Sequence, residues 1–241
     1  MTPAPVAVAH RGDPYHVREN TVASLRSALR RGADAVEIDV RLTRDGVPVL
    51  LHDATLKRLW EHERPLRALS SEEVRGLTGG GVPTLAEALG ATDGHRVMID
   101  LPGSPDVRAV HRIMGAVADA GAAERVYYCA GADAMLAVRT ADQAAEIALT
   151  WTTLAPPRPV LLEAIRPRWL NYRFSLVDRP LVERVHREGR LLSVWTPDTR
   201  RSMRRLLEAG VDSITTNRVD VLCATRASAA PPSPDRPGSR A

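Results

Sequence analysis

Residues 32–40 have the sequence GADAVEIDV, a short apolar strand pattern that carries two acids, Glu37 and Asp39. Successive side chains of a β-strand point to opposite faces, so these two carboxylates share one face. Two neighbouring carboxylates repel each other and are costly to remove from water. A divalent cation binds oxygen ligands and neutralises both charges. The pattern therefore indicates an inward-facing metal site. An exposed edge strand with two surface acids is the alternative interpretation.

Further apolar runs alternate with helical stretches on both sides of this strand. In the later part of the chain a helix follows each strand, which is typical of parallel strands with crossover helices. A tight-turn signal, Asp45-Gly46, lies between two of the extended runs, so we expect one of those two to be surplus to an eight-stranded barrel. The predicted extended segments are 5–9, 35–42, 47–51, 97–101, 126–129, 147–151, 170–174, 191–195 and 213–216.

The alternation predicts an α/β fold, a (β/α)₈ TIM barrel. Thr21 is a plausible N-cap for the first of the expected helices. A doubly wound open sheet is the main rival, but it normally has a glycine-rich phosphate loop after strand one, where this chain has HRGDP at 10–14. The expected helices are 22–31, 106–120, 132–140, 180–188, 199–209 and 219–226.

The chain has 241 residues, close to the usual size of one barrel of about 250 residues. We predict a single domain over residues 1–226. Residues 227–241 contain four prolines and few apolar side chains that could offset ordering entropy. We expect this segment to be a disordered tail.

Composition excludes several classes of protein. The net charge is +4, but arginines alternate with acids, and the cluster Arg200, Arg201, Arg204 and Arg205 has the spacing of a solvated helix face. We therefore expect no nucleic-acid partner.

Two cysteines, Cys129 and Cys223, rule out a disulfide scaffold and are expected to be buried, reduced thiols. No apolar run is long enough to span a membrane, and residues 1–9 lack a signal-peptide pattern, so a cytoplasmic location is expected.

Two histidines follow predicted strands. His10 could serve as a general acid or base, and Arg11 beside it could hold a phosphate with its guanidinium fork. His52 comes directly after the run 47–51. The next residue, Asp53, could orient an imidazole or cap the following turn, and spacing alone favours the cap.

A third acid, Asp100, ends an apolar strand just before Pro102 and Gly103. An acid in so apolar a strand is costly unless it is paired or bound to metal. In a TIM barrel all the carboxyl ends of the strands meet on one rim, where active sites lie. Three acids and two histidines near strand ends therefore predict one shared site.

The chain resembles the glycerophosphodiester phosphodiesterase family. The order and spacing of the motifs match through residue 53, and the resemblance continues loosely to residue 222. The motifs that carry it are HRG at 10–12, ENT at 19–21, GADAVEIDV at 32–40, TRDGVPV at 43–49, HD at 52–53, VPTLAEAL at 82–89, WT at 195–196 and GVDSITTN at 210–217.

This resemblance implies a phosphatidylinositol-phosphodiesterase-like barrel that hydrolyses glycerophosphodiesters to glycerol phosphate and an alcohol. It implies that Glu37, Asp39 and Asp100 hold Mg²⁺ or Ca²⁺. By the same resemblance His10 and His52 form the acid–base pair. The expected phosphate- and substrate-binding residues are Arg11, Glu19, Asn20 and Trp195.

The chain departs from the family pattern at three positions. The third metal acid is usually glutamate, and here it is Asp100. A lysine that often follows two residues later is replaced by Pro102, and the last strand ends in Asn217 instead of aspartate. Phospholipase-D-like action on lysolipids and a non-catalytic barrel that binds a phosphate ligand are the alternative functions. The former would need an apolar surface near the rim, of which the sequence shows little sign.

Overall fold

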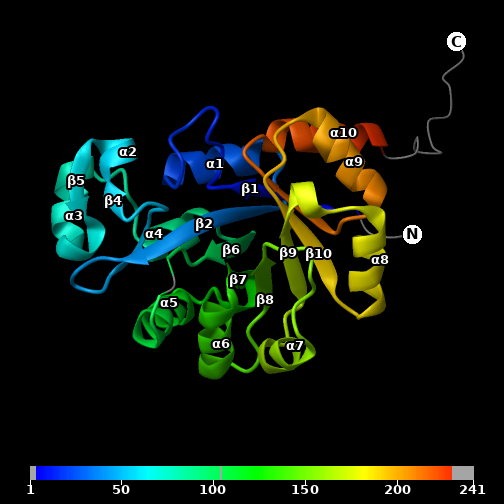
Figure 1. Cartoon of the computed structure of the whole chain (residues 1–241). Coiled ribbons are helices and arrows are strands. Elements are labelled where there is room, and N and C mark those ends of the chain that lie inside the picture. Colours follow the sequence, from blue (N-terminus) through cyan, green and yellow to red (C-terminus); the bar gives the residue numbers. More distant parts are fainter. Residues whose placement is uncertain (1–3, 104, 230–241) are drawn as a thin grey trace, which may run out of the picture.

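A closed barrel of eight parallel strands forms the centre of the protein in the computed structural model, which describes residues 4–103 and 105–229. Strand β1 pairs with both β2 and β11, and this closes the barrel. The sequence-based prediction of a TIM barrel is confirmed. Figure 1 shows the strands surrounded by helices. The barrel strands are β1 (Val6–His10), β2 (Ala35–Leu42), β6 (Arg96–Asp100), β7 (Val126–Ala130), β8 (Ile147–Trp151), β9 (Trp169–Arg173), β10 (Leu191–Trp195) and β11 (Ser213–Thr216).

Strand β3 (Pro48–Leu50) lies outside the barrel and pairs antiparallel with β2. The expected surplus segment near Asp45-Gly46 is thus confirmed as a hairpin strand. Residues 51–84, which we call the insertion, follow it with a small core of their own. Figure 1 shows the insertion beside the barrel, at the end of the long strand β2. It contains β4 (Thr55–Leu56), α2 (Lys57–Trp60), β5 (His62–Pro65), the 3-10 turn Leu66–Ala68 and α3 (Ser71–Thr78).

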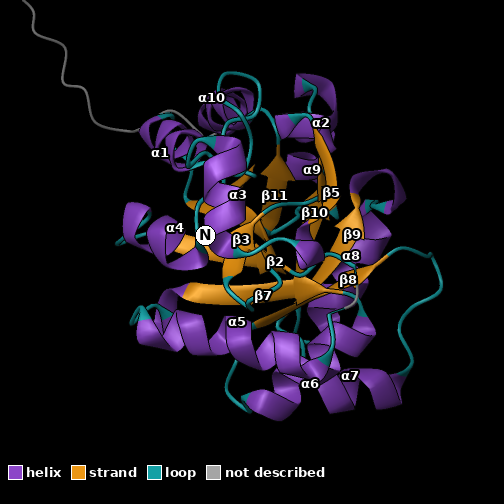
Figure 2. Ribbon diagram, turned by 90° about the vertical axis from the view of Figure 1, so that its left-hand side faces the viewer, coloured by secondary structure: helices purple, strands orange, loops and turns teal. Residues whose placement is uncertain are grey.

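Helices cover the outside of the barrel, as Figure 2 shows. The Oγ1 of Thr21 accepts a hydrogen bond from the backbone N–H of Ser24 at 3.1 Å, so the predicted cap is confirmed. The helix α10 extends three residues past the predicted end. The rest of the predicted tail lies outside the described residues. The helices are α1 (Val22–Arg30), α4 (Leu85–Ala91), α5 (Val107–Asp119), α6 (Ala132–Ala141), α7 (Pro159–Ile165), α8 (Arg179–Arg187), α9 (Arg200–Ala209) and α10 (Val219–Ala229).

Besides the four-residue α2, three helices were not expected from the sequence, although two of them begin with a recognisable signal. In α3 and α4 the side chains of Ser70 and Thr84 accept bonds from the backbone of Glu73 and Glu87, whose carboxylates bond back. This reciprocal capping box satisfies two N–H groups that a helix start leaves unpaired. The third, α7, is only seven residues long and begins with proline, so it offers little apolar periodicity.

The barrel interior changes from apolar to polar along the strand direction. Inward side chains near the strand starts form an apolar cluster that includes Val8, Ala35, Tyr127, Ala148 and Trp169. Two residues further along the same strands, the inward positions are polar. Because strand side chains alternate with a period of two, both sets face the same interior. The apolar layer therefore forms the floor on which a polar site is built.

Strand register places the predicted site residues at one level. His10 is the partner of Glu37 across β1 and β2, and Asp39 is the partner of Asp100 across β2 and β6. Because β2 lies between β1 and β6, it is no edge strand, and the alternative of two surface acids is wrong. Within the described residues, no helix is long and apolar enough to cross a membrane.

Candidate active site

A cavity of about 220 Å³ opens at the carboxyl ends of the strands. It brings together both predicted histidines and all three predicted metal acids. We call it the acid cavity. Its lining residues are His10, Arg11, Glu37, Asp39, His52, Met98, Asp100, Cys129, Thr150, Asn171, Trp195 and Thr215.

The three acids lie close together, and two of them are almost fully buried. Glu37 is 2% exposed and Asp39 is 1% exposed. Burial, followed by the charges of Asp39 and Asp100, raises the pKa of Glu37 well above its usual value. Burial and the charge of Asp39 raise the pKa of Asp100 to about 7. The carboxylates therefore repel one another, and the neighbouring positive and hydrogen-bonding groups do not fully compensate their negative charge.

Arg11 supplies part of the compensation. Its backbone N–H donates to Glu37 Oε2 at 2.8 Å, and its Nη1 donates to Glu19 Oε1 at 2.9 Å. Its Nε lies 2.9 Å from Asp39 Oδ2. The backbone of Arg11 is left-handed, and so is that of Gly12, where a Cβ would collide with Ser24. The tight turn after β1 therefore needs glycine at this position in order to aim Arg11 at the acids.

Asn20 and Glu19 lie behind the cavity wall and do not line it. The Asn20 amide donates to Asp39 Oδ2 at 2.7 Å, and its carbonyl accepts from the Asp39 backbone N–H at 3.2 Å. Glu19 accepts from both Arg11 and Arg58. The geometry makes these two residues supports for Asp39 and Arg11. Their predicted role in substrate binding stays a prediction.

A fixed chain of hydrogen bonds holds His10. The Asn217 amide donates to Asp198 Oδ2 at 2.8 Å, so its Oδ1 faces His10 Nδ1, 2.7 Å away. This orientation makes Nδ1 the protonated nitrogen and leaves Nε2, 3.9 Å from Glu37 Oε2, for proton exchange. Burial, and then the Arg11 charge, lowers the pKa of His10 below 6.5. The sequence identified Asn217 only as a departure from the family pattern and gave no sign of Asp198.

Asp53 and Arg58 hold the second histidine, His52. Its Nδ1 lies 2.8 Å from Asp53 Oδ1, and Arg58 Nε donates to Asp53 Oδ2 at 2.6 Å. The preferred interpretation of Asp53 as a turn cap is therefore wrong, because its carboxylate is used to orient the imidazole. Arg41 Nε donates to the His52 carbonyl at 2.8 Å and so fixes the same segment. Arg58 comes from the insertion, which thereby reaches the site.

Beside the acids, a belt of small polar side chains crosses the barrel, beginning at Cys129, the register partner of Asp100. Cys129 Sγ lies 3.2 Å from Thr150 Oγ1, and the Asn171 amide donates to both of them. Ser193 Oγ donates to Asn171 Oδ1 at 2.8 Å. Both cysteines of the chain are free thiols, Cys129 buried as expected and Cys223 half-buried. The belt satisfies the inward polar atoms without adding charge to the cavity.

Some polar atoms of the cavity lack a hydrogen-bond partner. Among the described residues, four buried side-chain nitrogen or oxygen atoms form no hydrogen bond, and three belong to the cavity lining: Arg11 Nε, Trp195 Nε1 and Thr215 Oγ1. Arg11 Nε still has an ion-pair partner, because it lies 2.9 Å from Asp39 Oδ2. Buried polar groups are nearly always paired, so a cluster of exceptions suggests that a ligand completes them. Trp195 Nε1 and Thr215 Oγ1 would suit the oxygens of a bound phosphodiester.

The acids also fit a divalent cation by their chemistry. In the described part of the chain, no three His, Cys, Asp or Glu side chains already form a ready-made metal site. Glu37, Asp39 and Asp100 nevertheless offer only carboxylate oxygens, the donors that Mg²⁺ and Ca²⁺ prefer. Their raised pKa values reflect charge repulsion that such a cation would relieve.

With the geometry described, comparisons with known proteins decide the family. The model of the glycerophosphoryl diester phosphodiesterase family matches residues 10–221. The chain belongs to this family. The resemblance based on sequence motifs is thereby confirmed, and so is its implication that the chain is a phosphoric diester hydrolase.

Individual relatives agree with this assignment. A glycerophosphodiester phosphodiesterase of Caldanaerobacter subterraneus is 28% identical, over 90% of this chain and 96% of the relative. A Mycobacterium tuberculosis protein named probable glycerophosphodiester phosphodiesterase 2 is 30% identical, over 90% and 89%. The fold matches an Oleispira antarctica phosphodiesterase solved with its product sn-glycerol-3-phosphate, with a TM-score of 0.78, 22% identity, and coverage of 92% and 96%. An Agrobacterium tumefaciens glycerophosphodiester phosphodiesterase gives a TM-score of 0.79, with 24% identity and coverage of 92% and 99%.

The raised pKa of Asp100 predicts how stability depends on pH when chelator keeps the protein free of metal. Folded Asp100 keeps its proton up to a pH of about 7, whereas the unfolded chain loses it near 3.8. The folded state therefore binds more protons between these values, and the free energy of unfolding falls as pH rises through this window. Glu37 acts in the same direction.

We expect Asp100→Asn to reduce this decline, and the exposed Asp119→Asn to leave it unchanged. Urea denaturation at a pH of about 5 and of about 8 measures it. Adding excess Mg²⁺ or Ca²⁺ to the wild-type protein at the higher pH should raise its free energy of unfolding again. An equally steep decline in Asp100→Asn would refute the assignment of uncompensated charge to this carboxylate.

Proposed function

We propose that the protein hydrolyses glycerophosphodiesters to glycerol phosphate and an alcohol, using His10 and His52 as acid–base catalysts and a divalent cation held by Glu37, Asp39 and Asp100. One observation carries the proposal: two oriented imidazoles and three partly uncompensated carboxylates line a single cavity. Family membership supports the reaction class.

His10 is suited to act as the base. Its lowered pKa keeps the imidazole neutral near pH 7, and Asn217 holds the proton on Nδ1. Nε2 therefore presents a lone pair to the cavity. It would take the proton from the attacking oxygen, which belongs to a substrate hydroxyl next to the phosphodiester or to water.

His52 is suited to act as the acid. Asp53 contacts its Nδ1, so Nε2 is the nitrogen left for proton transfer. As the bond from phosphorus to the leaving alcohol breaks, His52 would donate its proton to the departing oxygen. The two histidines exchange roles in the second half of the reaction, when water opens a cyclic phosphate. The proton taken by one imidazole then balances the proton given by the other.

The surrounding residues hold and neutralise the reacting groups. A cation on the three acids would offset the negative charge that develops on the phosphoryl oxygens, typically worth several kcal/mol. Arg11 is engaged with Asp39 and Glu19, so we assign it the positioning of the acids along with phosphate contact. Trp195 Nε1 and Thr215 Oγ1 are buried donors without a partner and would bind substrate oxygens.

The reaction is tested by turnover of glycerophosphocholine with purified protein. We expect release of glycerol phosphate that stops in chelator and returns when Mg²⁺ or Ca²⁺ is added in excess. The physical reason is that the three acids cannot stabilise a phosphodiester anion while their own charges are uncompensated. Full turnover in chelator would remove the metal from the proposal. No turnover of any glycerophosphodiester with either ion would favour a barrel that only binds phosphate.

The histidine roles are tested by substitution. We expect His10→Ala and His52→Ala each to lower kcat by roughly 10²–10⁴-fold, the usual contribution of general acid–base catalysis. The exposed His111→Ala provides a matched control and should retain wild-type kcat. Circular dichroism checks that each variant folds. Wild-type rates in both cavity variants would end the acid–base assignment.

A further inference from the structure

The exposed apolar side chains of the protein are concentrated on one face. Among the described residues, four large apolar side chains are more than half exposed: Tyr15 at 58%, Val107 at 54%, Leu154 at 68% and Val160 at 64%. Each lies on a connection that follows a barrel strand or in the first turn of the next helix. All four therefore lie on the rim where the acid cavity opens.

The β8–α7 connection carries the most exposed of them. Residues 152–157 have the sequence TTLAPP and contain no charge, and residues 152–156 are all exposed. In Figure 2 the chain runs out from the end of β8 as a long loop before it returns to α7. Leu154 is in this loop, and Val160 lies in the first turn of α7. The rim therefore carries a projecting, uncharged segment with one exposed leucine, and a second exposed apolar side chain, Val160, lies near it in the chain.

Arginines surround this loop. The strands β8, β9 and β10 are neighbours in the barrel, so their connections leave the rim side by side. Arg173 ends β9, Arg158 follows β8, and Arg200 and Arg201 follow β10. All four are exposed. None of the four side chains forms a hydrogen bond or ion pair with any described residue. The acids of the same connections are engaged, since Asp178 caps α8 and Asp198 binds Asn217.

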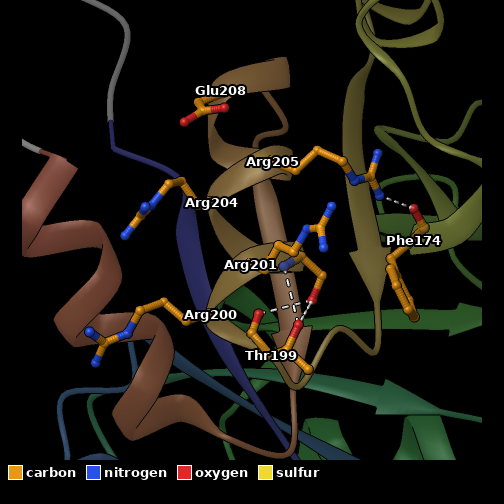
Figure 3. Close-up of a pocket in the computed structure, with 8 residues that line it drawn as sticks. Phe174, Thr199, Arg200, Arg201, Arg204, Arg205 and Glu208 are labelled. Carbon is orange, nitrogen blue, oxygen red and sulfur yellow. Dashed lines mark hydrogen bonds between the residues drawn. The ribbon is translucent and has the colours of Figure 1, made fainter.

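A groove of about 820 Å³ lies along the start of α9. Figure 3 shows Arg201 and Arg205 on the side of α9 that faces Phe174, and Arg200 and Arg204 on the other side. Arg205 donates to the carbonyls of Val177 and Phe174, at 2.6 and 2.9 Å. The other three guanidinium groups project without a partner among the described residues. Glu208 is the only acid in the groove lining.

We propose that the rim formed by the connections after β8, β9 and β10 docks onto an anionic lipid bilayer. The unpaired arginines contact lipid phosphates, and Leu154 and Val160 enter the boundary between headgroups and acyl chains. An apolar side chain that inserts beside a basic patch is the combination that holds a protein on a membrane surface. That the docked face then presents the acid cavity to phosphodiesters in the lipid layer rests on the proposed function. The docking itself does not.

The apolar exposure corrects the earlier expectation from the sequence. The sequence showed little sign of an apolar surface near the rim, because Tyr15, Val107, Leu154 and Val160 are far apart along the chain. The barrel topology brings their connections to one face. The arginines of α9, expected to form a solvated helix face, are indeed exposed, but they lie beside that apolar loop.

Docking is tested by co-sedimentation of the full chain with vesicles. We expect binding to vesicles of equal parts phosphatidylcholine and phosphatidylglycerol, and binding at least about tenfold weaker to phosphatidylcholine alone. The double variant Arg200→Glu/Arg201→Glu should lose at least about tenfold in affinity for the anionic vesicles. Equal binding to both vesicle types, or no binding to either, would overturn the proposal.

A matched control separates local docking from net charge. Arg30→Glu/Arg187→Glu changes the charge of the chain by the same amount, with exposed arginines in the last turns of α1 and α8, at the opposite face. This control should bind the anionic vesicles as the wild type does. If the control variant lost as much affinity for anionic vesicles as the rim variant, binding would depend on the net charge of the chain, and the proposal of a docking face would be refuted.

Leu154 tests the apolar half of the proposal. Leu154→Asp should weaken binding to anionic vesicles by roughly tenfold, because a charged side chain resists insertion. Full binding by Leu154→Asp would overturn the insertion. None of these variants touches the acid cavity, so turnover of soluble glycerophosphocholine should stay at the wild-type rate in each. A wild type that binds vesicles but turns over no glycerophosphodiester would contradict the proposed function alone.

Discussion

Mutual repulsion among three buried carboxylates is the constraint around which the site is organised. The closed barrel places Asp39 beside Asp100 and Glu37 beside His10 by strand register alone. Around them lie Arg11, which a left-handed turn aims at the acids, the Asn20 amide on Asp39, and the uncharged polar belt beside Asp100. The pKa values of Glu37 and Asp100 stay raised in spite of these donors. In the proposed function a cation would complete the charge balance, and both histidines line the same cavity as the acids.

The barrel separates the tasks of stability and chemistry. Its lower interior and the space between strands and helices are filled by aliphatic side chains, which hold the fold without directing any charge inward. The strand ends and their connections can therefore carry costly polar groups. Each histidine is positioned from a different part of the chain, His10 by Asn217 and Asp198 after the last two barrel strands and His52 by Asp53 and Arg58 within the insertion. The proton transfer that we propose would therefore depend on contacts from two separate parts of the fold.

The sequence predicted the barrel strands well, because each strand is a short apolar run and a helical stretch separates it from the next in the later part of the chain. It also placed the three acids and two histidines at strand ends, since an acid in an apolar strand is visible without a structure. It missed α3 and α4 although both have capping-box residues, because their apolar stripes are short. The support of His10 by Asn217 and Asp198, and of His52 by Arg58, could not be predicted. The contact of His10 with Asn217 joins residues far apart in the sequence that only the closed barrel brings together. Asp53 and Arg58 lie within six residues of His52, but strand and helix patterns do not specify the loop geometry that joins them. The exposed apolar side chains of the rim could not be predicted either, because they are far apart in the sequence and the barrel topology brings them to one face.

Calorimetric titration of metal-free protein with Ca²⁺ and with Mg²⁺ tests the central claim most directly. If Glu37, Asp39 and Asp100 converge on one cation, the wild type binds a single ion per chain with either metal or with both. Asp39→Asn then weakens that binding by at least about tenfold, since it removes the acid that faces both of the others. The exposed Asp119→Asn binds as the wild type does. Wild-type protein that binds neither ion, or undiminished binding by Asp39→Asn, would contradict a shared cation at the ends of β2 and β6.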